Sequence, residues 1–112
     1  MIKLWIDDLR PAPKGYVWVK NVRTAKLYCY QYLYEGNDGR PHLTIEEFHL
    51  DHDSGDQCVM GGDYIEFLKW LEEKTYTENW VIDSVFKIHS GNVVGINNMK
   101  TIIEYNNWRL EP

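Results

Sequence analysis

Acidic residues follow directly after two of the most apolar stretches of this sequence. The stretch LWIDDLR leads into Asp7 and Asp8, and the stretch HLDHDSG leads into Asp51 and Asp53, with His52 between the last two acids. Carboxylates bind hard cations such as Mg²⁺, and imidazoles transfer protons near neutral pH. The pattern therefore indicates candidate binding or catalytic chemistry at the ends of buried segments.

The elements that position these residues can be predicted from local patterns. Residues 8–15 hold two prolines and a glycine, which predicts a loop. Apolar residues at helical spacing predict three helices, the first capped by Thr24, the second capped by Asp63, and the third beginning around residues 90–97. Stretches rich in β-branched and aromatic residues predict four strands, at residues 3–6, 16–21, 43–50 and 84–89.

The order strand, loop, strand, helix, strand, helix, strand, helix predicts an α/β fold. Strands that alternate with helices form parallel βαβ units with right-handed crossovers. We expect a three-layer sandwich with a mainly parallel four-stranded sheet, similar to a truncated flavodoxin-like fold. A chain of 112 residues suffices for one core, so residues 1–112 are predicted to form a single domain.

Composition narrows the possible partners and compartments. The formal net charge of −5 argues against extended nucleic-acid binding, which needs a basic face, but allows a small phosphate-bearing ligand or an RNA end. The two cysteines, Cys29 and Cys58, form no zinc-like spacing and favour a reducing compartment. Neither a secretory signal nor a membrane-spanning apolar run is recognisable. We therefore expect a cytoplasmic protein without membrane contacts.

The acidic residues are expected to meet at one edge of the sheet. In open α/β sheets, ligands bind beyond the carboxyl ends of the strands. Asp7 and Asp8 follow the first predicted strand, Asp51 to Asp53 follow the third, and His89 with Ser90 follow the fourth. The repulsion between clustered carboxylates is tolerable if a divalent cation such as Mg²⁺ lies among them. Any one of these acids could instead be a turn former or a helix cap.

Four stretches together resemble a known family. They are DDLRPAP, LDHD, GGDYIEFLKWL and HSGNVVGINNM, and they span most of the chain. They are similar to the receiver-like family proposed to process cyclic phosphates, which is associated with RNA repair and conflict systems. Two features depart from phospho-accepting receivers: the first crossover helix is replaced by the loop 8–15, and we expect no fifth strand ending in a phosphate-contacting Lys.

The resemblance implies a role for each of the polar residues. It implies that Asp7, Asp8 and Asp51 hold the metal, and that the reaction centre or phosphate is contacted by His52, Asp53, His89, Ser90 and Asn92. Opening a cyclic phosphate needs a general base and a general acid, which two histidines on adjacent strand ends could supply. Asp51 or Asp53 could orient one imidazole.

Arg10, Ser90 and Asn92 could hold the phosphate itself. Arg10 could grip it through the guanidinium fork, although pairing with Asp7 or Asp8 is an equal alternative. Ser90 and Asn92 could donate hydrogen bonds near the start of the last helix, and both are also ordinary N-cap residues.

Three functions follow from these expectations. The first is a phosphoesterase that opens a cyclic phosphate, of a nucleotide or an RNA end, with a His pair and an acidic metal cluster. The second is a non-catalytic module that binds a phosphate or a nucleotide. The third is a receiver that accepts a phosphoryl group on Asp51, which the expected lack of the Lys disfavours.

Overall fold

The main sheet has five parallel strands in the order β2-β1-β5-β7-β8. The computed structural model describes all residues from 1 to 112. The bounds of these strands are Lys3–Ile6 (β1), Val17–Val19 (β2), Glu47–Leu50 (β5), Val85–Ile88 (β7) and Arg109–Leu110 (β8). The predicted α/β fold with a mainly parallel sheet is confirmed. The predicted number of four strands is wrong, because the two-residue strand β8 pairs with β7 and is too short to show a periodic pattern.

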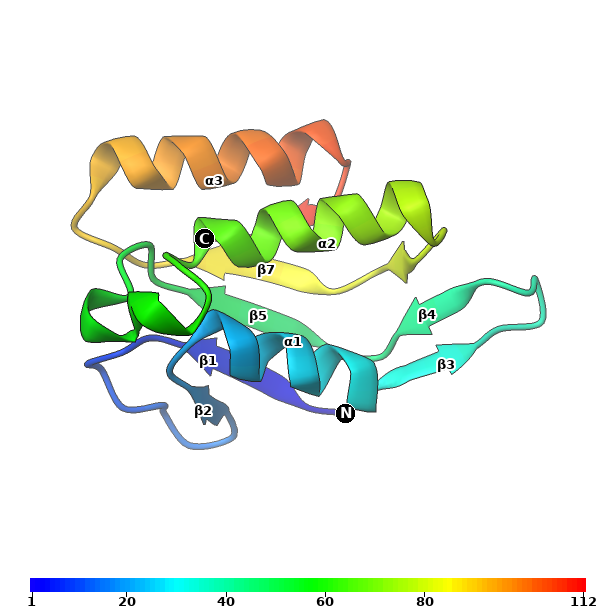
Figure 1. Ribbon diagram of the computed structural model, residues 1–112, viewed down its shortest axis with the longest axis horizontal. Helices are drawn as coiled ribbons and strands as arrows, with labels where there is room; N and C mark the ends of the chain where they lie inside the picture. Colours follow the sequence, from blue (N-terminus) through cyan, green and yellow to red (C-terminus); the bar gives the residue numbers. More distant parts are fainter.

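A second, three-stranded sheet extends from one end of the molecule. Its order is β3-β4-β6, where β3 (Leu33–Glu35) and β4 (Pro41–Leu43) form an antiparallel hairpin and β6 (Val81–Ile82) runs parallel to β4. Figure 1 shows the hairpin projecting away from the helices. The strand predicted over residues 43–50 is thus two strands, since Leu43 ends β4 and Glu47 begins β5.

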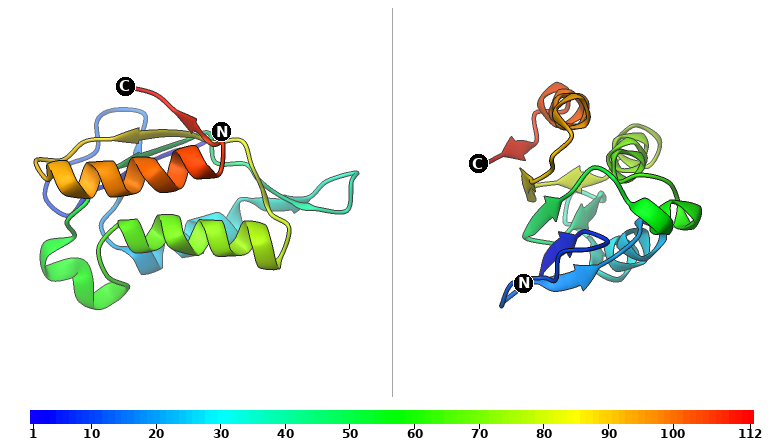
Figure 2. Two further views of the ribbon diagram at one scale, coloured as in Figure 1. Left: turned by 90° about the horizontal axis from the view of Figure 1, so that it is seen from above. Right: turned by 90° about the vertical axis from the view of Figure 1, so that its left-hand side faces the viewer.

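All three helices cover the same face of the main sheet (Figure 2). They are α1 (Val22–Gln31), α2 (Ile65–Thr77) and α3 (Val93–Tyr105). Each helix lies in a connection between parallel strands: from β2 to β5, from β5 to β7 and from β7 to β8. These three connections move across the sheet in the same direction, so right-handed crossovers place all three helices on the same face. Only the step from β1 to β2 runs the other way, and it contains no helix. The sheet and the helices therefore form two layers. The predicted three-layer sandwich is wrong because no helix covers the other face of the sheet.

The core lies between this sheet and the helices. Alternate residues of the central strands point toward the helices and are fully buried, among them Leu4, Phe48 and Phe86. The Phe48 ring lies 5.2 Å from the ring of Phe86 and 5.3 Å from that of Phe67 on α2, measured between centroids. The core therefore fixes β1, β5 and β7 side by side, with their carboxyl ends at one edge.

Helix ends differ from the predicted caps. Asn21, not Thr24, caps α1: its side-chain oxygen accepts a hydrogen bond from the Thr24 N–H at 2.8 Å. Asp63 does not cap α2; its carboxylate accepts hydrogen bonds from Ser54, at 2.9 Å from the backbone N–H and 3.1 Å from the hydroxyl. Ser54 precedes the 3₁₀ helix η1 (Gly55–Met60), which lies between β5 and α2. None of the helices has the length and apolar character needed to cross a membrane.

The face of the sheet without helices is closed by the loop after β1 and by aromatic rings. The Trp5 indole N–H donates to the backbone oxygen of Arg10 at 2.9 Å, which fastens the loop over β1. The Trp5 ring stacks on His89 at 4.3 Å and meets the edge of His49 at 4.4 Å. Tyr16 donates a hydrogen bond to Glu47 beside this cluster.

His49 makes the stability of this cluster depend on pH. Burial, with a further contribution from the neighbouring His89, lowers the pKa of His49 from 6.5 to about 4. Between these values the unfolded chain binds a proton that the folded chain does not, so stability falls as the pH falls through this range. We expect His49→Phe, which keeps an aromatic ring beside Trp5, to lose less stability than the wild type between pH 7 and pH 4.5.

Urea denaturation at the two pH values measures this difference. An equal loss of stability in both proteins would contradict the role of His49.

Candidate functional site

A polar cleft of about 470 Å³ opens at the carboxyl ends of β1, β5 and β7. Six of the residues predicted to act together line it. The lining residues are Asp8, Leu9, Arg10, Asp51, Asp53, Gly55, Ser90, Gly91 and Asn92. The three strand ends therefore meet at a cleft, as predicted. The volume of this cleft lies within the range of small-molecule sites. Asp7, His52 and His89 do not line it.

Asp7 lies behind the cleft as a buried anchor for the loop. One carboxylate oxygen accepts hydrogen bonds from the N–H groups of Leu9 and Arg10, at 2.9 and 3.0 Å. The other lies 2.6 Å from the Nε2 atom of His89. Burial acts to raise the pKa of Asp7, but these hydrogen bonds prevail and hold it below its usual value. Asp7 is therefore a fixed negative charge directly beneath the cleft.

The negative charge of Asp8 is disfavoured by its surroundings. Burial and the nearby charges of Asp7, Asp51 and Asp53 raise the pKa of its carboxyl. Ligand oxygens of Asp7, Asp8 and Asp51 lie within 4.8 Å of one another. A divalent cation would offset this repulsion, and three carboxylates are the hard oxygen donors that Mg²⁺ prefers. The residues at this position therefore fit the predicted cation.

The two histidines lie on opposite faces of the sheet. His89 continues the alternation of β7 and points to the face without helices, where it stacks on Trp5. His52 lies on the helix side against the first turn of α3: a β-carbon at Gly95 would come within 2.5 Å of its ring. The expectation that both imidazoles lie in one cleft is therefore wrong. The alternation of side chains that points Phe48 and Leu50 toward the helices puts His52 on the same side and His89 on the other.

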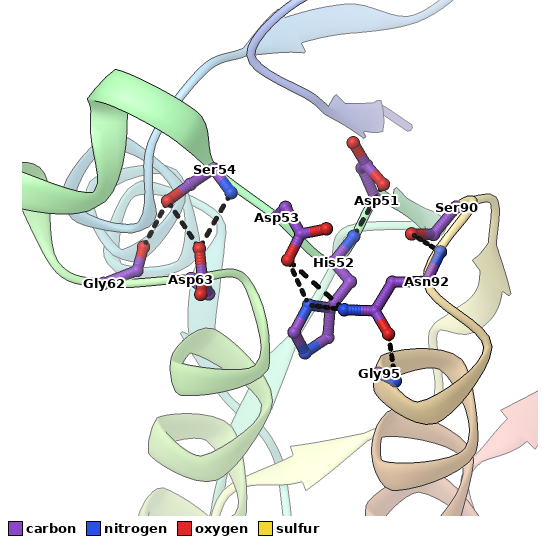
Figure 3. Close-up of polar contacts among 9 residues, drawn as sticks. All are labelled: Asp51, His52, Asp53, Ser54, Gly62, Asp63, Ser90, Asn92 and Gly95. Carbon is purple, nitrogen blue, oxygen red and sulfur yellow. Dashed lines mark hydrogen bonds and ion pairs between the residues drawn. The ribbon is translucent and has the colours of Figure 1, made fainter.

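His52 instead supports two residues that line the cleft (Figure 3). Its Nδ1 atom lies 2.8 Å from a carboxylate oxygen of Asp53. The Asn92 amide nitrogen lies 3.4 Å from both the same His52 nitrogen and the same Asp53 oxygen. The Asn92 side-chain oxygen caps α3 by accepting from the Gly95 N–H at 2.8 Å. Asn92 thus has the cap role that was the alternative to phosphate binding, and it also lines the cleft.

Ser90 and the first turn of α3 supply unused donors beside the cleft. The Ser90 oxygen accepts a hydrogen bond from the Asn92 N–H at 3.1 Å, which leaves its hydroxyl hydrogen available. Helix geometry gives the N–H groups of Val93 and Val94 no partner within α3, and the first turn contains no acidic residue. This end of the helix therefore favours an anion.

Sequence reasoning missed Asp63 as a member of this region. His52, Asp53 and Asp63 each offer a ligand atom within 4.8 Å of the others. Asp63 was predicted as a helix cap because it precedes an amphipathic segment. No local pattern reveals the contact with Ser54 that turns it back toward His52 and Asp53.

A comparison with known protein families matches most of the chain. The family model of the cyclic-phosphate processing receiver domain matches residues 2–105. The chain belongs to this family. No match was found among curated proteins or among solved structures.

Two features of the structure distinguish this receiver domain from phospho-accepting receivers. A fifth strand is present, contrary to expectation, but the residue that follows β8 is Glu111 and not a lysine. The loop between β1 and β2 replaces the first crossover helix, as predicted. Arg10, which belongs to this loop, is the single basic residue that lines the cleft.

A substitution at Gly55 tests whether the position of the Asp8 carboxylate determines the affinity for a cation. Its φ of +54° disfavours other residues, and a β-carbon there would come within 2.5 Å of the Asp8 carboxylate. We expect Gly55→Ala to weaken Mn²⁺ binding at least about tenfold, as for losses in the outer shell of metal sites, when measured by isothermal titration calorimetry.

Gly39→Ala is the matched control. Gly39 has a φ of +75° but has open space around it, so the variant should carry similar backbone strain, about 1 kcal/mol, without loss of Mn²⁺ affinity. Equal affinities in both variants would count against the placement of the cation beside Asp8.

Proposed function

We propose that this receiver domain is a phosphoesterase that opens a cyclic phosphate with the help of Mg²⁺ or another divalent cation. In this reaction water attacks phosphorus, one ester P–O bond breaks, and the products are a phosphomonoester and a free hydroxyl. The observation that carries the proposal is that an acidic cluster, an arginine and a helix N-terminus share one cleft in a member of this family.

The cation would be held by Asp8 and Asp51, which line the cleft, with Asp7 behind them. The Asp7 oxygen that accepts hydrogen bonds from Leu9 and Arg10 uses both of its lone pairs, but the oxygen beside His89 keeps one lone pair for a ligand. When bound, such a cation supplies Lewis-acid chemistry: it polarises a phosphoryl oxygen and favours the ionisation of water.

The phosphate would lie between Arg10 and the start of α3. Arg10 offers a bidentate, charged donor from one side of the cleft. The Ser90 hydroxyl and the N–H groups at the helix end offer donors from the other side. These groups lie on opposite walls of the cleft, and they would orient the ester for attack.

We assign Asp53 as the general base, which takes a proton from the attacking water. It lines the cleft, and contacts with His52 and Asn92 hold its carboxylate. In this scheme His52 positions Asp53, and His89 positions Asp7. The histidines thus act through carboxylates, whereas the sequence suggested direct acid and base roles.

Loss of a cation ligand provides the direct test. We expect Asp51→Asn to reduce the Mg²⁺- or Mn²⁺-dependent hydrolysis of 2′,3′-cyclic nucleotides by about 100-fold or more, because it removes one of the two carboxylates that hold the cation in the cleft. Asp83→Asn is the control, since Asp83 is an exposed acid at the opposite end of β7. Product formation can be followed by chromatography.

The same experiment separates this function from the second candidate, a non-catalytic binding module. That alternative is favoured by the position of both imidazoles outside the cleft. It predicts saturable binding of the cyclic nucleotide without product for every divalent cation tried, and this result would refute the phosphoesterase.

A further inference from the structure

Strand β8 forms one open edge of the main sheet. It is the last strand in the order β2-β1-β5-β7-β8, and Figure 2 shows it at the outer side of the molecule. The Glu111 N–H donates to the backbone oxygen of Phe86 in β7 at 2.9 Å. Backbone groups of successive residues in a strand point to opposite sides, so the N–H and C=O of Leu110 point away from β7. These two groups can pair with another strand.

The residues on either side of Leu110 carry opposite charges. Arg109 and Glu111 are both exposed, and in an extended strand their side chains point to the face opposite that of Leu110. The Arg109 guanidinium donates to the backbone oxygen of Asp83 at 2.7 Å. It has five N–H donors, so others remain for a carboxylate of another chain.

These charges select one way of pairing β8 with the β8 of a second copy. A two-fold axis between antiparallel strands places one residue opposite its own counterpart. If that residue is Arg109 or Glu111, like charges lie directly opposite each other, which is destabilising. If it is Leu110, Arg109 of each copy lies opposite Glu111 of the other. In this register the two Leu110 residues also exchange both backbone hydrogen bonds.

We propose that this protein forms a two-fold symmetric dimer through β8, in which the main sheets of two copies join into one continuous sheet. The side chain of Leu110 lies on the helix side, because its partner Phe86 in β7 is buried there. Beside it, a pocket of about 270 Å³ is lined in part by Ile88 and Lys100. Leu110 of the second copy would lie next to this pocket and bury apolar area there.

The ends of β8 limit the pairing to three residues of each strand. The next ladder bonds would need the N–H groups of residues 108 and 112. The Trp108 N–H already donates to the backbone oxygen of Ile103 at 3.1 Å, and Pro112 has no N–H. The shared surface is therefore small, and we expect a transient dimer and not a permanent one.

The opposite edge of the sheet lacks this charge pattern. Strand β2 has the sequence Val17, Trp18 and Val19, so the same symmetric pairing would place valine opposite valine without an ion pair. The cleft at the ends of β1, β5 and β7 lies within one copy and stays open in the dimer. The dimer therefore does not depend on the proposed function.

Analytical ultracentrifugation of the full chain, from about 10 μM to about 1 mM under reducing conditions, tests this inference. We expect a monomer–dimer equilibrium with a Kd of about 0.1 mM. Arg109→Glu and Glu111→Arg should each weaken dimerisation at least about tenfold, because both cross-strand pairs then carry like charges. An equimolar mixture of the two variants should dimerise again, since each Glu of one lies opposite an Arg of the other.

Arg23→Glu and Glu73→Arg are the matched controls, because they make the same changes of charge at exposed positions on α1 and α2. Each control variant should dimerise like the wild type. A monomer at every concentration would overturn the inference. So would a dimer that both β8 variants leave intact, or a mixture of these variants that associates no more than either variant alone. None of these results would affect the proposed function.

Discussion

The pairing of Asp7 with His89 is the interaction on which the site depends. It joins the end of β1 to the end of β7 across β5, with 2.6 Å between the carboxylate oxygen and the ring nitrogen. The other Asp7 oxygen holds the backbone of Leu9 and Arg10. One buried carboxylate thus fixes both the loop that forms one wall of the cleft and the strand that leads into the opposite wall. A charge in this position is maintained because three donors compensate for its burial.

The direction of the chain through the sheet explains why that loop has such a role. Every connection that advances from β2 toward β8 places its helix on one face. The reverse step from β1 to β2 is the only one available to cover the other face, and it does so with a short proline-containing loop and the rings of Trp5 and Tyr16. The element that completes the fold therefore also supplies Asp8, Leu9 and Arg10 to the cleft.

The parts of this structure that follow from strand periodicity were predictable, and the parts set by turns were not. The convergence of Asp8, Asp51 and Ser90 follows because parallel strands end at the same edge of a sheet. The separation of His52 from His89 was predictable in the same way, because alternation from Phe48 and Leu50 puts His52 on the helix side and alternation from Phe86 puts His89 on the other. Strand β8 escaped prediction because two residues carry no periodicity, and Asn21 rather than Thr24 caps α1 because the helix begins one turn earlier than its apolar stripe suggests.

The arrangement of charges bears on how such a site could act. The two imidazoles serve as supports, one for Asp7 and one for Asp53, and both lie outside the space where a ligand would lie. The groups that face a ligand are then carboxylates and one arginine. Carboxylates repel a phosphate, and a cation bound among them would offset this repulsion. Cation and phosphate ligand should accordingly bind with positive cooperativity, since each removes the charge that opposes the other.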